Sequence, residues 1–136
     1  MTHADVFVFG RNKGKRGSFF STVVVLDNGE PWFRCIPCGN LTTNQSELKA
    51  IELGLRVINP AFKMDRVSVH VGNRYIIGML ARDGDVWSKT PQTNKGLIER
   101  VRFLLGDYEF EVLDADKENK HFKFARKMLE DTCKAE

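Results

Sequence analysis

The chain has 136 residues, 42% of them hydrophobic and 29% charged, and its 21 Lys+Arg against 18 Asp+Glu give a net charge of +3. This length and composition are typical of one globular domain over residues 1–136 and exclude a disordered chain. No apolar run approaches the roughly 18–20 residues that span a bilayer, so we expect no membrane partner. The charge balance is too small to identify a nucleic-acid partner by itself.

The cysteine content and the first residues of the chain favour a cytoplasmic, reducing compartment. Three cysteines are an odd number and too few for a disulfide scaffold. Cys35 and Cys38 form a Cys-x-x-Cys pair, but the other cysteine and the three histidines are too scattered to complete a zinc site. The N-terminal residues lack the basic and apolar regions of a secretory signal.

The first third of the chain has the pattern of β-strands. β-branched and aromatic residues fill positions 4–9, which end at Gly10, and a polar loop follows over 11–17. Further strands are predicted over 18–26 and 31–37, separated by the turn signal Asp27-Asn28-Gly29. Two such connections predict an antiparallel meander of three strands.

From residue 44 the apolar residues recur with the period of a helix, forming one stripe up to residue 58. Asn44 is the predicted N-cap of this helix, with Glu47 three residues later, and Asn59-Pro60 ends it. The remaining predicted elements are a strand over 66–71, helices over 74–80 and 94–105, a strand over 108–113, and a helix from about 118 to 133.

The element order is therefore β-β-β-α-β-α-α-β-α. Strands that are separated by helices are expected to be parallel, because a crossover returns the chain to the same end of the sheet. The predicted fold class is α/β, with a mixed five-stranded sheet that helices flank.

This order, together with the string Thr42-Thr43-Asn44-Gln45-Ser46-Glu47-Leu48-Lys49-Ala50, resembles the ribonuclease H family. In that family a Thr-Asn-Asn-x-Ala-Glu-Leu pattern opens the first helix, and its Glu binds catalytic metal. Weaker similarities lie at residues 70–77, at 87–97 and at Glu118-Asn119. The resemblance implies a ribonuclease H-like sheet and, in active members, two Mg²⁺ ions held by about four carboxylates at the scissile phosphate.

The chain departs from the family at the other three carboxylate positions. They align with Phe9, Gly72 and Lys123, so only Glu47 stands in its expected place. One carboxylate cannot hold two hard divalent cations, and we expect no metal site and an apolar cleft beside Phe9. We also expect Lys123 to form an ion pair with Glu47 in place of the metals. A second interpretation makes Glu47 the third-position member of a helix capping box.

Two further acids could replace the missing carboxylates. Asp114 and Asp116 follow the last predicted strand, at the sheet edge where the parallel strands end, and with Glu47 they could form a relocated Mg²⁺ or Mn²⁺ site. The alternative is a solvated acidic turn before the last helix.

The strongest candidate for nucleic-acid binding is a basic segment after the first strand. Lysine and arginine neutralise phosphates there, and glycines let the backbone approach them. An ordinary solvated hairpin loop is the alternative. The candidate residues of this segment are Arg11, Asn12, Lys13, Lys15 and Arg16.

The resemblance implies two further contact regions. Thr43, Asn44 and Gln45 match the family's minor-groove contacts, although a helix N-cap explains Asn44 equally well. The family's basic helical region, which contacts DNA phosphates, corresponds to Trp87, Lys89, Asn94 and Lys95 here. An exposed polar helix start is the alternative interpretation of that second region.

These observations favour a catalytically degenerate ribonuclease H-like domain that binds RNA, an RNA–DNA hybrid or a nucleoprotein. Two alternatives stay open at this point. One is an active, metal-dependent ribonuclease H with relocated carboxylates, and the other is a scaffold that binds a protein partner.

Overall fold

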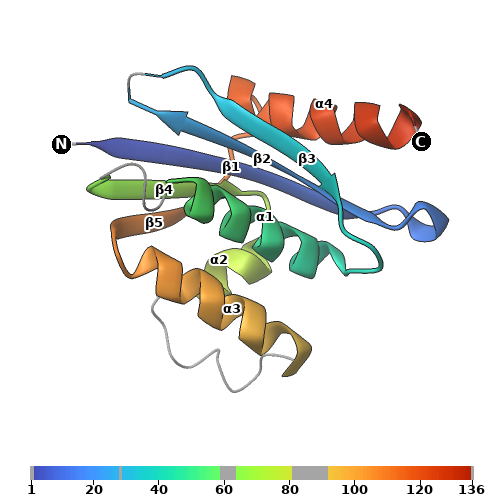
Figure 1. Cartoon of the computed structure of the whole chain (residues 1–136), viewed down its shortest axis with the longest axis horizontal. Helices are drawn as coiled ribbons and strands as arrows, with labels where there is room; N and C mark the ends of the chain where they lie inside the picture. Colours follow the sequence, from blue (N-terminus) through green and yellow to red (C-terminus); the bar gives the residue numbers. More distant parts are fainter. Residues whose placement is uncertain (1, 28, 59–63, 81–91, 136) are drawn as a thin grey trace.

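A five-stranded mixed sheet with helices on both faces organises the chain in the computed structural model, which describes residues 2–27, 29–58, 64–80 and 92–135 (Figure 1). The element order is the one predicted from the sequence. In chain order the elements are β1 (His3–Asn12), the short 3₁₀ turn η1 (Gly14–Arg16), β2 (Ser18–Leu26), β3 (Trp32–Pro37), α1 (Thr43–Ile58), β4 (Arg66–Val71), α2 (Arg74–Leu80), α3 (Gln92–Leu105), β5 (Glu109–Asp114) and α4 (Lys120–Ala135).

The strands lie in the order β3-β2-β1-β4-β5. β1 pairs with β2, and β2 with β3, in antiparallel fashion, whereas β1–β4 and β4–β5 are parallel pairs. This arrangement confirms the predicted meander followed by parallel strands. β1 and β4 run parallel, and β4 ends at Val71, level with Val8, while β1 continues beyond that point to Asn12.

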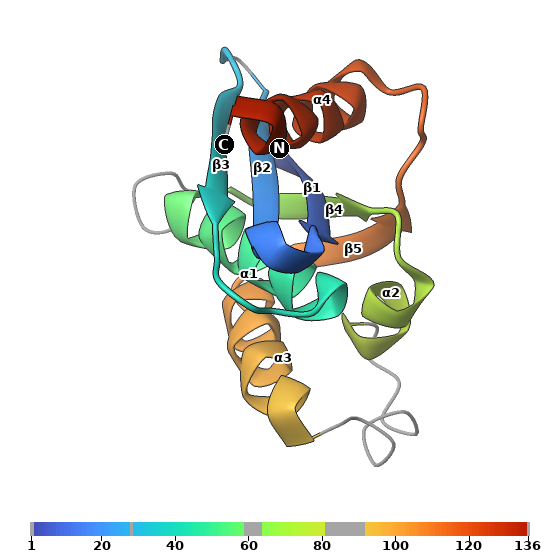
Figure 2. The same ribbon diagram turned by 90° about the vertical axis from the view of Figure 1, so that its right-hand side faces the viewer.

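Two helical layers cover the sheet unequally. α1, α2 and α3 lie on one face, and α4 lies alone on the other, across β1, β2 and β3 (Figures 1 and 2). Alternation within the strands sends Val67, Val69 and Val71 towards the α1 side, where all three are fully buried. Within the described residues, no helix combines the length and apolarity that crossing a membrane requires.

Helix α1 approaches the sheet closely through a glycine. A Cβ added at Gly54 would lie 2.6 Å from Cγ1 of Val6 and 3.1 Å from Cγ2 of Thr22. Thr22 also donates a hydrogen bond of 2.8 Å from its hydroxyl to the carbonyl oxygen of Ala50. This close approach fixes α1, and with it the N-terminal turn that carries Glu47.

The first strand is longer than predicted. β1 continues past Gly10 to Asn12, because Arg11 and Asn12 pair with the start of β2. The hairpin closes through a 2.8 Å bond from the backbone N–H of Lys13 to the carbonyl of Gly17, whose φ of 83° favours glycine. Arg11 and Asn12 are therefore strand residues, and only the tip of the predicted loop is a turn.

The N-cap of α1 is Thr42, and the prediction of Asn44 for this role is wrong. The backbone N–H of Gln45 donates to Oγ1 of Thr42 at 3.1 Å, and the N–H of Thr42 donates to Oε1 of Gln45 at 3.0 Å. This reciprocal pair is a capping box with Gln45 at its third position. Asn44 and Glu47 consequently lie inside the helix, and the capping role considered for Glu47 is also wrong.

Candidate nucleic-acid interface

A cavity of 260 Å³ lies where β4 ends beside β1, between the first turns of α1 and α4. The register that aligns Val8 with Val71 places Phe9 beside Gly72 at this point. The cavity therefore occupies the position at which the family resemblance places the catalytic carboxylates. Its lining residues are Phe9, Arg11, Glu47, Gly72, Lys117, Phe122 and Arg126.

Glu47 is the single acidic residue of this lining, and it is 5% exposed. Burial raises the pKa of its carboxyl to about 7. Hydrogen bonds from Asn73 and from the backbone of Gly10, and the charge of Arg11, lower this pKa, but their effect is smaller than that of burial. A Cβ at Gly10 would lie 2.7 Å from Cγ of Glu47, so only glycine lets the strand pass this side chain. The carboxyl is thus enclosed between β1, α1 and α2.

Asn73 connects this carboxyl to α2. Its Oδ1 accepts the backbone N–H groups of Tyr75 at 3.0 Å and Ile76 at 3.4 Å, which caps the helix. Its Nδ2 donates to Oε1 of Glu47 at 2.8 Å and to Oδ1 of Asn44 at 2.7 Å. The sequence reasoning missed Asn73, although an asparagine directly before a predicted helix is a signal for an N-cap.

Aromatic and cationic side chains form the rest of the cavity. The rings of Phe9 and Phe122 meet edge to face with centroids 6.0 Å apart, and the guanidinium of Arg11 lies 5.1 Å from the centroid of Phe9. Lys117 and Arg126 add two further positive charges. The expected apolar cleft is present in its two phenylalanines, but three cations line it as well.

The donor set of the cavity does not fit a pair of divalent metal ions. Mg²⁺ and Mn²⁺ bind oxygen ligands, and the lining offers one carboxylate together with three cations that repel a metal. Among the residues that the structure describes, no three His, Cys, Asp or Glu side chains come together as a metal-binding group. The chemistry of these residues therefore differs from that of the family's two-metal site.

Asp114 and Asp116 do not join Glu47 in a shared site. Both are exposed, and neither lines the cavity. Oδ1 of Asp116 accepts the backbone N–H of Glu118 at 2.9 Å, as in a polar turn before a helix.

The predicted ion pair between Lys123 and Glu47 is wrong. Nζ of Lys123 lies 2.8 Å from Oε2 of Glu118, and its side chain is 58% exposed. Oδ1 of Asn119 accepts backbone N–H groups at the start of α4 and sets the phase of the helix. With that phase Phe122 and Arg126, one turn apart, face the cavity instead.

Two cations of the basic segment hold η1 against α4. Nζ of Lys13 lies 3.2 Å from Oε2 of Glu130, and Arg16 donates from its guanidinium to the carbonyl of Cys133 at 2.7 Å. Asn12 joins the hairpin to the segment before α1 by donating to the carbonyl of Leu41 at 3.0 Å. The other two cations of this segment are Arg11, which lines the cavity, and Lys15, which is exposed.

A polar chain joins the candidate residues of α1 and α3. Gln45 donates from Nε2 to Oδ1 of Asn94 at 3.2 Å, and Asn94 donates from Nδ2 to the hydroxyl of Tyr75 at 3.2 Å. Thr43 is exposed at the start of α1, and Lys95 is half-buried on α3. Trp87 and Lys89 lie outside the described residues.

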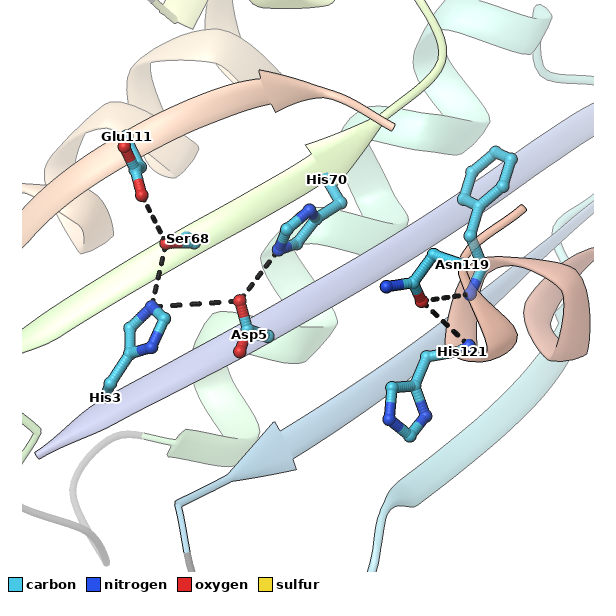
Figure 3. Close-up of polar contacts among 8 residues, drawn as sticks. His3, Asp5, Ser68, His70, Glu111, Asn119 and His121 are labelled. Carbon is cyan, nitrogen blue, oxygen red and sulfur yellow. Dashed lines mark hydrogen bonds and ion pairs between the residues drawn. The ribbon is translucent and has the colours of Figure 1, made fainter. Parts of the chain in front are cut away.

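The three histidines lie on the α4 side of the sheet and outside the cavity lining (Figure 3). Nε2 of His70 lies 2.7 Å from Oδ1 of Asp5, and the ring of His70 stacks on Phe7 with centroids 4.2 Å apart. Ser68 hydrogen-bonds Nε2 of His3 at 2.8 Å and donates to a carboxylate on β5 at 2.8 Å. This network cross-links β1, β4 and β5.

Comparison with known proteins places this architecture in a recognised class. No protein-family model matches the chain, and no curated protein matches its sequence. Three solved structures are similar to it over nearly their whole length. The first is a ribonuclease H1 from the halophilic archaeon Halobacterium salinarum, with 18% identity and a TM-score of 0.74, over 95% of this chain and 98% of that one. The second is the N-terminal ribonuclease H domain of a Mycobacterium tuberculosis protein, with 13% identity and a TM-score of 0.74, over 99% of this chain and 98% of that one. The third is a ribonuclease H1 isolated from compost, in complex with an RNA/DNA hybrid, with 13% identity and a TM-score of 0.74, over 95% of this chain and 98% of that one.

The chain therefore has the ribonuclease H-like fold. The mixed sheet, its strand order and the four helices agree with those structures, as the sequence resemblance implied. At 13–18% identity the similarity establishes the fold, and the function has to be argued from the cavity.

Proposed function

We propose that this chain binds RNA or an RNA–DNA hybrid, free or within a nucleoprotein, and does not cleave it. The observation that carries the proposal is the lining of the cavity where β4 ends beside β1. Three cations and two phenylalanines surround one enclosed carboxyl there. Such a lining attracts the phosphate backbone and lacks the ligands that hold catalytic metal ions.

The fold supports the nucleic-acid part of this proposal. One structure of the same fold, the compost ribonuclease H1, is in complex with an RNA/DNA hybrid. Thr43 and Lys15 are exposed on this chain, and Arg11 lines the cavity, so these candidate residues are available to a bound strand. Asn44, Gln45 and Asn94 are hydrogen-bonded to side chains of neighbouring elements, so their first role is to position the elements around the cavity.

Two measurements on the whole chain test the proposal. Fluorescence anisotropy at low salt should detect binding of a labelled hybrid or RNA duplex, with an affinity that falls as salt is raised. Incubation of the same hybrid with Mg²⁺ or Mn²⁺ should leave both strands intact. Absence of binding to every nucleic acid tested would refute the proposal.

The position of Glu47 favours a second candidate function, that of an active ribonuclease H. Its place on α1 matches the family's metal-binding glutamate. Cleavage of the hybrid that the Glu47→Gln variant abolishes would establish that enzyme. A protein scaffold would instead bind a protein partner equally well after Lys15 and Arg11 are replaced by alanine.

A further inference from the structure

The cations of the cavity differ from the other basic side chains around them in standing outside any ion pair. Lys13, Lys123 and Lys127 each form an ion pair with a carboxylate at 2.8–3.2 Å. Within the described part of the chain, no carboxylate lies within ion-pair distance of Arg11, Lys117 or Arg126, which line the cavity. Three neighbouring positive charges outside any ion pair create a local positive potential that favours an anionic ligand.

Arg11 contacts an aromatic residue of the same lining, and Arg126 lies on the helix that carries a second one. The guanidinium of Arg11 lies 5.1 Å from the ring centroid of Phe9, and Phe9 packs edge to face against Phe122. Arg126 follows Phe122 by one turn of α4, so it lies on the same helix face. This packing orients the Arg11 guanidinium before a ligand arrives, which reduces the entropy cost of binding.

The carboxyl of Glu47 does not neutralise these cations by an ion pair. It accepts the 2.8 Å bond from Asn73, lies against Gly10 and is 5% exposed. The open part of the cavity is therefore lined mainly by positive and aromatic groups. An oxygen-rich anion fits such a lining better than a metal cation does.

We propose that this cavity binds a phosphate group of a nucleic-acid strand directly, through Arg11, Lys117 and Arg126, without an intervening divalent metal ion. The guanidinium fork matches two phosphate oxygens, and the lysine contributes a point charge. This inference rests on the proposed nucleic-acid function and deepens it by naming the group that the cavity recognises. It extends the site to Lys117, which lies before α4, and to Arg126, which lies on α4.

The test compares charge-matched variants in binding a labelled RNA–DNA hybrid that lacks terminal phosphates, in buffer with EDTA. Arg11→Gln and Arg126→Gln each remove one cavity cation, and Arg66→Gln removes one exposed arginine at the far end of β4. We expect each cavity variant to weaken binding about tenfold, as for removal of a charge-assisted hydrogen bond, and the control to change it less than twofold. The slope of log affinity against log salt should also become shallower by about 0.7–0.9 for each phosphate that the variant no longer neutralises.

Two further readouts identify the ligand. Inorganic phosphate, titrated at millimolar concentration, should shift the amide resonances of Gly72 and Phe122 in the wild-type chain and not in the Arg11→Gln variant. Replacing EDTA with Mg²⁺ should not raise the affinity for the hybrid beyond the ordinary effect of ionic strength. Thermal melts of the variants confirm that each is folded under the binding conditions.

The outcomes separate this inference from the function on which it rests. Binding that all three variants retain equally would overturn the phosphate site and leave nucleic-acid binding in place. Binding that requires Mg²⁺ would overturn the direct interaction and support a metal-dependent site. If only hybrids with a terminal phosphate respond to the cavity variants, recognition of backbone phosphates is wrong. No binding of any nucleic acid would refute both proposals.

Discussion

Replacing Glu47 by glutamine should remove a specific part of the pH dependence of folding. Burial raises the pKa of this carboxyl from 4.5 to about 7 in the folded chain. Below pH 4.5 both the folded and the unfolded chain hold the proton, so the group has no effect on the free energy of unfolding. Between these values the folded state keeps a proton that the unfolded chain has released, so stability falls as pH rises.

The size of the effect follows from the two pKa values. One pH unit of pKa difference corresponds to about 1.4 kcal/mol, so the fully ionised carboxyl lowers the free energy of unfolding by about 3 kcal/mol. Between about pH 5 and pH 8 the expected loss is about 2–3 kcal/mol. Glutamine is similar in shape and keeps an acceptor for Asn73, but it does not titrate.

Urea unfolding of the wild type and of Glu47→Gln at pH values from about 5 to 8 measures this contribution. The difference in unfolding free energy between the two proteins should change by about 2–3 kcal/mol across the range, in favour of the variant at the alkaline end. Other titrating groups are common to both proteins and cancel in the comparison, as does any pH-independent effect on a hydrogen bond. Parallel stability profiles would refute the burial and raised pKa of Glu47.

Three further substitutions test the packing and polar interactions around the cavity. Gly10→Ala places a methyl group against Glu47 and should lower the free energy of unfolding, measured by urea unfolding, by about 1–3 kcal/mol. Gly29→Ala is the control, because open space surrounds Gly29, and it should change the free energy of unfolding by less than about 0.5 kcal/mol. Asn73→Ala removes the α2 cap and a donor to Glu47, so it should cost about 1–2 kcal/mol and raise the pKa of that carboxyl further, which carboxyl NMR titration measures. Lys13→Ala should lower stability by at most about 1 kcal/mol at low salt and by less at about 1 M salt; an equal effect at both would contradict the ion pair to α4.

The periodicity of apolar residues predicted most of the helices and strands, because the side of each element that is buried determines this periodicity. The core contains the alternate strand residues Val67, Val69 and Val71, as predicted. It also contains Phe122 and Leu129 from the predicted apolar stripe of the last helix. The parallel arrangement of β1, β4 and β5 followed from the intervening helices. These features depend on local pattern and chain connectivity, which a single sequence contains.

The errors lie where two local signals compete. Thr42 and Asn44 are both good N-caps, and the structure uses Thr42 because Gln45 reciprocates its hydrogen bond. Alignment with the family places Lys123 at the cavity, but the cap at Asn119 sets a helix phase that turns Lys123 outward.

The convergence of Arg11, Lys117 and Arg126 could not be predicted from sequence spacing. They come from β1, from the segment before α4 and from α4, and no periodicity relates them. Only the path of the chain from β5 across the sheet edge brings them to one cavity. Helical geometry alone predicts that Phe122 and Arg126, four residues apart, lie on the same face of the last helix.

The cavity lies between residues of β1, β4 and α1 on one side and residues on and just before α4 on the other. α4 is attached to the sheet by the 2.6 Å bond from Ser21 to the carbonyl of Ala125, and at its far end by Arg16 on the carbonyl of Cys133. With a rise of about 1.5 Å per residue, Cys133 lies about 10 Å along the helix axis from Arg126. Between these points Leu129 and Cys133 pack against Phe19 of β2, so the helix is fixed to the sheet along its length. The position of Arg126 at the cavity therefore depends on core packing that lies outside the cavity lining.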